Sequence, residues 1–459
     1  MTTQNNSTSS RLSELATTPV GRLLWKYSLP AVIGTVVTAL YNLIDSIVIG
    51  HAIADPNVIA GIAVTFPVMT LSGALGMLIG AGAATRISIA LGQKDKPRAE
   101  MILGNSVVMT ILIGITYITC FYIFLDPILR VFGASDATIV YGRQFMQWIL
   151  PGMVLINLTF SYNNVMRATG YPRKAMYTNI LGAMLNAILA PLFLFGFGWG
   201  IWGAALATDI SMMITATWVM SHFFQKKNSL TFRRGTYRLQ WRIVRSVIMI
   251  GMAPFLINLA SAGINAIING TLQTYGGDNA IAAIVAFNRY VTVFIFVVMG
   301  ICQGMQPILG YNYGSGRYNR LFSTYKIAVF TALGVTTLGT IIATICPRQI
   351  ASLFMQDEAQ IRAAVQCLQI TTISFWMVGF QIVSTNFFQS LGMAGKAIFL
   401  SLTRQVIFMI PLLVILPGHF GLAGVWSAFP ISDSLATIVT GLLIWRQIKV
   451  IKNKPIIKS

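Results

Sequence analysis

The chain has 459 residues, of which 55% are hydrophobic and only 10% are charged, and its mean hydropathy is +0.72. A water-soluble protein carries roughly 25% charged residues, so this composition excludes an ordinary soluble domain. Apolar runs of about 20 residues recur along the chain, and each is long enough to cross the hydrocarbon core of a bilayer as a helix. The sequence therefore predicts an all-α membrane protein.

Apolar runs and turn residues together predict twelve transmembrane helices in chain order. The first six lie near 22–50, 57–85, 101–125, 138–166, 175–197 and 199–224. The second six lie near 242–274, 279–310, 320–346, 359–389, 396–416 and 421–446. The division is thus a tail at 1–21, a six-helix bundle at 22–224, a linker at 225–241, a second bundle at 242–446 and a basic tail at 447–459.

The net charge of +20 is distributed unevenly between the predicted connections. Basic residues gather in every second gap, around 86–98, 167–174, 226–245, 317–326 and 396, and at both ends of the chain. The other gaps hold only Arg130, Arg143, Arg348 and Arg362. This alternation is the positive-inside bias, which places both termini and the linker in the cytoplasm. Nucleic-acid binding requires no such alternation, so we expect no nucleic-acid partner.

The two bundles resemble each other at an offset of roughly 222 residues. Matching positions include Pro30 with Pro254, Gly170 with Gly392, Lys174 with Lys396, and Gly203 with Gly424. Each half has an even number of spans, so the repeats are parallel. Parallel repeats are related by an axis along the membrane normal and enclose a cavity between them.

Of the twelve acidic residues, only Asp45, Asp209 and Asp433 lie inside predicted spans. An intramembrane carboxylate is unfavourable unless it is paired, hydrated or protonated. Asp45 lies five residues before the outer end of its span, roughly 8 Å deep, with Asn42 on nearly the same face. No basic residue of its half lies at similar depth, so Asp45 is a candidate to bind a proton, or sodium where neutral oxygens converge on it. A structural, hydrogen-bonded Asp is the alternative.

The other two intramembrane acids have different surroundings. Asp209 directly follows Thr208, and neighbours on a helix point about 100° apart, so a cation pathway and a helix–helix contact both remain open. Asp433 shares its half with Arg289 and Arg404 at middle depths. An ion pair with one of these arginines is the favoured interpretation for Asp433.

Weaker candidates are polar residues inside the first bundle. Asn163, Asn164 and Asn186 either hydrogen-bond between helices or line a cavity. The four cysteines lack CxxC spacing, the three histidines form no cluster, and there is no HExxH, P-loop or GxSxG motif. We therefore expect neither an enzyme nor a cofactor, and no metal beyond a coupling sodium ion.

Several motifs together resemble the multidrug and toxic compound extrusion (MATE) transporters, in particular their bacterial DinF-type branch. The motifs are Tyr41-Asn-Leu-Ile-Asp45, Leu91-Gly-Gln-Lys94, Arg167-Ala-Thr-Gly170, Gly203-Ala-Ala-Leu-Ala-Thr208 and Gln306-Pro-Ile-Leu-Gly-Tyr-Asn-Tyr-Gly314. The resemblance covers about 20 to 446. It implies a V-shaped, two-lobed antiporter that exports cationic or amphipathic drugs in exchange for H⁺ or Na⁺.

The resemblance also implies a cation site in the first lobe. Its members map to Asp45, Asn186 and Thr208, and Asp209 could contribute through water. The family's second acid maps to Ala190, a departure that leaves the choice of ion open. Asn163 matches a cavity-lining Asn of the family, and Asn42 and Asn164 join it as candidates for the substrate cavity.

The resemblance implies a monomer in the bacterial inner membrane with small organic substrates and membrane lipid around it. A flippase for lipids or lipid-linked saccharides, which shares the broader fold, is the alternative. It is expected to carry a more cationic central cavity, for which Arg289 and Arg404 are the only candidates.

Overall fold

A computed structural model describes residues 13–52, 55–225 and 228–453. These residues are almost entirely helical and include no strand. The helices of the N-terminal half are α2 (Val20–Ala52), α3 (Pro56–Gly92), α4 (Lys96–Ile123), α5 (Leu125–Val131), α6 (Ile139–Ile149), α7 (Met153–Ala168), α8 (Pro172–Pro191), a short π-helix (Leu192–Gly196) and α9 (Gly200–Phe224). Those of the C-terminal half are α10 (Trp241–Gly314), α11 (Tyr318–Ile345), α12 (Pro347–Ser352), α13 (Glu358–Thr371), a 3₁₀ turn (Thr372–Ser374), α14 (Phe375–Ser390), α15 (Ala394–Leu402), a second π-helix (Thr403–Met409) and α16 (Ile410–Lys452).

Nine helical segments of the described residues are long and apolar enough to cross a membrane. Two of them are hairpins, because α10 and α16 each contain a glycine with positive φ, Gly277 (61°) and Gly421 (57°). An L side chain rarely adopts this conformation, so glycine suits both turns. Beyond the α16 turn, Gly424 packs against the backbone of Leu416, which a continuous helix would not allow. Counting both halves of each hairpin, and adding α6 with α7, gives the twelve expected spans.

The fourth predicted span is divided into two helices. Residues 150–152 form a turn between α6 and α7, and Pro151 lies within it. A proline lacks the N–H that a continuous helix requires and collides with the preceding turn. The break places Gly152 beside α9, where it packs against Asp209.

Acidic residues close to helix ends act as caps. Asp55 accepts a hydrogen bond from the backbone N–H of Asn57 (2.9 Å), and Asp95 accepts one from that of Arg98 (3.1 Å). Asp357 does the same for Ala359 at the start of α13 (2.9 Å). These bonds satisfy N–H groups that have no partner within the helix. These three acids are therefore explained by local structure.

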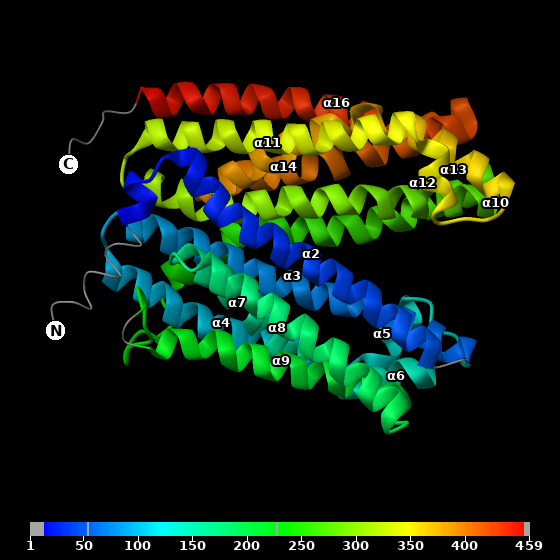
Figure 1. Cartoon of the computed structure of the whole chain (residues 1–459), viewed down its shortest axis with the longest axis horizontal. Helices are drawn as coiled ribbons and strands as arrows, with labels where there is room; N and C mark the ends of the chain where they lie inside the picture. The colour runs from blue at the N-terminus through cyan, green and yellow to red at the C-terminus, as the bar shows by residue number, and fades with distance from the viewer. Residues whose placement is uncertain (1–12, 53–54, 226–227, 454–459) are drawn as a thin grey trace.

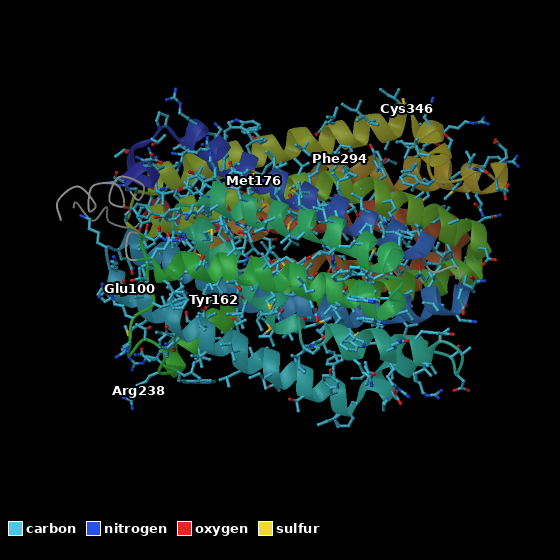
Figure 2. All side chains as sticks on the ribbon, turned by 60° about the horizontal axis from the view of Figure 1, so that its bottom comes forward. Glu100, Tyr162, Met176, Arg238, Phe294 and Cys346 are labelled. Carbon is cyan, nitrogen blue, oxygen red and sulfur yellow. The ribbon has the colours of Figure 1, made fainter. Side chains whose placement is uncertain are left out.

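The helices form two bundles, α2–α9 and α10–α16, which meet at the end that carries both chain termini and diverge towards the other end (Figure 1). We call the first the terminal end and the second the open end. Glu100 and Arg238 lie at the terminal end, and Cys346 lies towards the open end (Figure 2). The expected V-shaped architecture of two homologous bundles is confirmed.

Each bundle receives the first turns of the other bundle's leading helix. Leu23, Leu24 and Tyr27 of α2 are buried in a cluster with Met305 and Leu321 of the C-terminal half. Conversely, Val247 of α10 is buried in the main cluster of the N-terminal half. The two halves therefore share their cores at the terminal end, where they are held together by buried apolar surface.

Candidate functional site

The central feature of the N-terminal bundle is a stripe of α2 that faces α8. Gly34, Tyr41 and Asp45 are spaced by seven and four residues, which places them on one face of the helix. At Gly34 the helices approach so closely that a Cβ would lie 2.9 Å from the amide nitrogen of Asn179 on α8. This close approach directs the rest of the stripe, including Asp45, towards the interior of the bundle.

Polar groups from three helices meet around Asp45. The Asn186 amide on α8 donates a hydrogen bond to the Thr208 hydroxyl on α9 (2.9 Å), which in turn donates to the carbonyl of Ala204 (3.2 Å). The Tyr41 side chain lies near both Thr208 and Asp45. One carboxylate oxygen of Asp45 is buried and has no hydrogen-bond partner among the described residues. The cluster thus combines one carboxylate with neutral oxygen ligands.

Ala190 lies at about the level of Asp45. It is eleven residues beyond Asn179 on α8, just as Asp45 is eleven residues beyond Gly34 on α2, and Gly34 and Asn179 are in contact. Ala190 is buried and packs with Phe193 and Ala207 in a small apolar cluster. The position to which the resemblance assigns a second acid is therefore occupied by apolar packing.

Asn163 and Asn164 belong to a hydrogen-bond network in α7. The guanidinium of Arg167, which is buried, donates to the side-chain carbonyls of both asparagines. The Asn163 amide donates to the Ala175 carbonyl (2.9 Å) and to the Asn179 side chain (3.0 Å). Asn163 is only 3% exposed, so it packs between α7 and α8 and differs from the expected cavity-lining residue. The side chain of Asn42 lies outside the described residues.

Asp209 lies apart from the Asp45 cluster. Thr208 faces α8, whereas the Asp209 carboxylate packs directly against Gly152 at the break between α6 and α7. One of its oxygens is buried without a hydrogen-bond partner in the described part of the chain. Because adjacent residues of a helix point about 100° apart, Asp209 contacts a different pair of helices from Thr208. Of the two interpretations left open, this geometry favours the helix–helix contact.

The C-terminal bundle holds an ion pair at Asp433. Arg404, in the π-helix after α15, donates to one carboxylate oxygen, and the Ser374 hydroxyl donates to the other (3.0 Å). Asp433 is only 2% exposed. Both of its oxygens have hydrogen-bond partners, as buried polar groups require. Arg289 takes no part in this pair and instead lines a cavity between α10 and the α12–α13 turn.

Three members of the networks in the N-terminal bundle were not predicted as site residues: Tyr41, Arg167 and Asn179. Their spacing carried a signal. Tyr41 is four residues before Asp45, Arg167 is four after Asn163, and Asn179 is seven before Asn186, so each shares a helix face with a predicted residue. Which faces meet across helices is not readable from spacing alone. Among the described residues, no group of three or more His, Cys, Asp or Glu side chains could hold a metal ion.

Two six-helix bundles with three intramembrane acids, two of which have a buried oxygen without a partner among the described residues, define a multi-pass membrane transporter. The chain belongs to the MatE family, whose profile matches residues 30–192 and again residues 253–415. The two matches begin 223 residues apart, in agreement with the internal repeat.

Named relatives and solved structures match nearly the whole chain. Multidrug export protein MepA of Staphylococcus aureus (strain MRSA252) is 28% identical over 428 residues, which is 93% of this chain and 94% of that protein. MepA of Staphylococcus saprophyticus is 25% identical over 419 residues, which is 91% of this chain and 92% of that protein. The outward-facing structure of a multidrug resistance MATE family transporter superposes with a TM-score of 0.90, at 24% identity, over 96% of this chain and 98% of that one.

Proposed function

We propose that this chain is a secondary active antiporter that exports cationic or amphipathic organic compounds across the bacterial inner membrane in exchange for H⁺ or Na⁺. The Asp45 carboxylate carries the proposal, because one of its oxygens is buried without a hydrogen-bond partner among the described residues, close to polar groups of α8 and α9. An uncompensated charge in such surroundings favours uptake of a proton or cation. The name of the MepA relatives, multidrug export protein, supports drug-like organic substrates.

Asp45, Tyr41, Asn186 and Thr208 are the proposed cation site. A bound proton or cation neutralises Asp45. The neutral group no longer requires polar surroundings, so ion binding favours a different packing of α2 on α8 and α9. Cation binding and rearrangement of the first bundle are thereby coupled. We propose that the terminal end lies in the cytoplasm, because basic residues gather in every second connection, and that the bundles therefore diverge towards the outside. We propose that the chain works as a monomer.

Protons are proposed to drive export at least as well as sodium. A sodium ion is best bound by several oxygens at short range, and a second carboxylate offsets the loss of its water. With Ala190 in apolar packing, the site supplies one formal charge and the side-chain oxygens of three residues. A proton requires only the one carboxylate.

An accumulation assay in an efflux-deficient bacterial host tests the function. Cells that express the chain should retain less of a cationic dye such as ethidium than cells with the empty vector, and a protonophore should abolish the difference. Equal retention of drug dyes, combined with movement of a fluorescent lipid analogue between leaflets, would favour the flippase alternative. That alternative requires a cationic cavity, and Arg404 is already paired with Asp433.

A further inference from the structure

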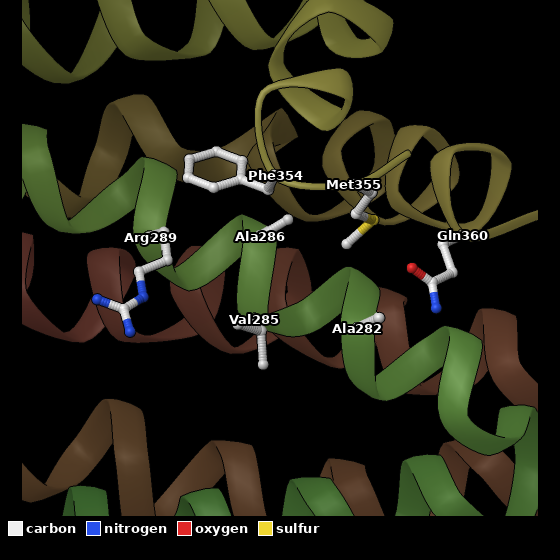
Figure 3. Close-up of a pocket in the computed structure, with 7 residues that line it drawn as sticks. All are labelled: Ala282, Val285, Ala286, Arg289, Phe354, Met355 and Gln360. Atoms are coloured by element: carbon white, nitrogen blue, oxygen red, sulfur yellow. The ribbon is translucent and has the colours of Figure 1, made fainter. Parts of the chain in front are cut away.

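The cavity lined by Arg289 in the C-terminal bundle has features of a binding site and is separate from the Asp433–Arg404 ion pair. It has a volume of about 430 Å³ and lies where α10 meets the turn between α12 and α13. Phe354 and Met355 cover its middle, with Arg289 at one end and Gln360 at the other (Figure 3). Apart from these two polar side chains, the residues that line it are apolar.

Arg289 faces the space between the two bundles. Gly300 of α10 packs against Val32 of α2, and the carbonyl of Phe296 accepts a hydrogen bond from Thr35 (3.2 Å). Arg289 is eleven residues before Gly300, a spacing that returns to the same helix face. It therefore continues the inter-bundle face of α10 towards the open end, where Val293 is 60% exposed.

The Arg289 guanidinium is exposed, and no carboxylate forms an ion pair with it among the residues that the structure describes. An arginine within a membrane-spanning helix requires water, a partner or a ligand. Its planar guanidinium suits two-point hydrogen bonding to a carboxylate, sulfonate or phosphate. The neighbouring Phe354 and Met355 offer a polarisable apolar surface beside that charge.

We propose that this cavity binds amphiphiles that carry an anionic group, with the anion on Arg289 and the apolar body against Phe354 and Met355. The inference rests on the proposed function and extends it, because it assigns a place on Arg289 to the anionic group of such compounds. The same chemistry could belong to a transported compound or to an anionic lipid headgroup.

A matched pair of dyes tests the site. Rhodamine 110 carries a free carboxylate, and rhodamine 123 is its methyl ester, so the two differ only at that group, which is charged in one and neutral in the other. Binding is measured by fluorescence anisotropy with the full chain in phosphatidylcholine nanodiscs. Arg289→Gln should weaken rhodamine 110 binding about tenfold or more, because a charge-assisted hydrogen bond is lost, and should leave rhodamine 123 nearly unchanged.

Two variants serve as controls. Arg289→Lys should retain part of the affinity for rhodamine 110, and Arg362→Gln, which removes an exposed charge of α13 outside the cavity, should retain all of it. An equal loss for both dyes, or no loss for either, would overturn the proposal. Because binding is measured without an ion gradient, failure of gradient-driven transport would leave this result intact.

The lipid composition of the nanodisc distinguishes the two sources of the anion. If a lipid headgroup is the natural ligand, phosphatidylglycerol should displace rhodamine 110 from the natural chain. If a transported anion is the ligand, phosphatidylglycerol should have no effect on rhodamine 110 affinity. In either case Arg289→Gln should abolish the preference of the chain for rhodamine 110 over rhodamine 123.

A separate observation concerns the segment before α2, which binds to the opposite bundle. Leu15 is fully buried in the cluster of the C-terminal half. Its carbonyl accepts a hydrogen bond from Asn312 (3.2 Å), that of Ala16 accepts one from Arg317 (2.8 Å), and that of Thr18 accepts one from Arg320 (2.6 Å). The segment continues directly into α2 of the N-terminal bundle, so it links the two halves.

The pseudo-symmetric segment before α10 is docked in the same manner. Arg233 pairs with the buried Glu100 of α4 (2.9 Å), and Asn105 hydrogen-bonds to the backbone at Thr236, Arg238 and Gln240. We infer that residues 13–18 act as a strap that holds the terminal end closed and must detach before that end opens. Alternating access requires such an opening.

Distance measurements between spin labels test the strap. Labels at the exposed positions Gln93 and Ser323, in a chain whose four native cysteines are serine, report the separation of the bundles at the terminal end. Leu15→Asp should shift the distance distribution to longer values. Leu353→Asp, which places the same charge at an 80% exposed leucine of the open end, should not. Identical distributions for Leu15→Asp and the natural chain would overturn the inference.

Discussion

Gly92 and Gly314 occupy equivalent positions in the two halves, and each packs against a backbone carbonyl of the other half. Gly92 contacts the carbonyl of Tyr311, and Gly314 contacts that of Ile89. The same offset of 222 residues relates the two glycines and the two carbonyls. The pseudo-two-fold axis of the repeat therefore passes between these helices at the terminal end, where neither position has room for a Cβ.

Substitution of Gly92 tests how closely the bundles must meet. Gly92→Leu should force the Tyr311 backbone away, and overpacking of this kind costs about 1–3 kcal/mol. We expect a lower melting temperature in detergent and reduced export. Gly73→Leu is the matched control, because a Cβ at Gly73 meets nothing within 4 Å. Equal behaviour of the two variants would show that the close contact is unimportant.

The ion pair of Asp433 and Arg404 is expected to be structural. Asp433→Asn or Arg404→Gln alone leaves an unpaired buried group, which costs about 3–5 kcal/mol in a buried pair; partial exposure of Arg404 should reduce its share. The double variant Asp433→Asn, Arg404→Gln should recover much of the loss. Thermal unfolding in detergent measures all three. Natural stability in the Asp433→Asn protein would contradict a structural role.

Asp209 is expected to be dispensable for coupling. Its carboxylate packs on Gly152, away from Thr208 and Asn186, so Asp209→Asn keeps the size of the side chain and leaves the Asp45 cluster untouched. We expect at least about half of natural export, within the small range typical of substitutions outside a site. Uptake of ethidium into inverted vesicles measures it. A loss as complete as that of Asp45→Asn would place Asp209 in the cation pathway.

Restoring the second acid tests ion choice. Ala190→Asp adds a carboxylate at the level of Asp45, which should favour sodium because a second charge offsets the loss of its hydration. Export by this variant should depend more strongly on a sodium gradient than export by the natural chain. Ala190→Asn, which adds similar bulk without charge, is the control. No difference between the two variants would mean that position 190 does not contribute to ion selection.

The fold was largely predictable from the sequence, because each membrane-spanning helix satisfies its own backbone and so appears as an apolar run. The repeat was visible in the match of Gly170 with Gly392. The break at Pro151 could have been predicted from the proline itself. The contact of α2 with the C-terminal bundle could not have been predicted, because nothing in the sequence around Leu23 and Leu24 shows which helix buries them.

The candidate site was predictable in its acids but not in its contacts. Asp45 was conspicuous as a charge inside an apolar run. The bond between Asn186 and Thr208 depends on how α8 packs on α9, and the role of Asn163 depends on Arg167 lying in the same network. Spacing defines a helix face, whereas tertiary packing decides which faces meet.

Efflux from proteoliposomes under separately imposed proton and sodium gradients tests the central claim most directly. Purified natural chain and Asp45→Asn are reconstituted side by side, loaded with ethidium, and checked for equal melting temperature. The natural chain should transport ethidium when a proton gradient is imposed, and at least as fast as with a sodium gradient, whereas Asp45→Asn should show no gradient-driven transport. Full transport by Asp45→Asn would contradict the role of this carboxylate, and strict sodium dependence of the natural chain would contradict proton coupling.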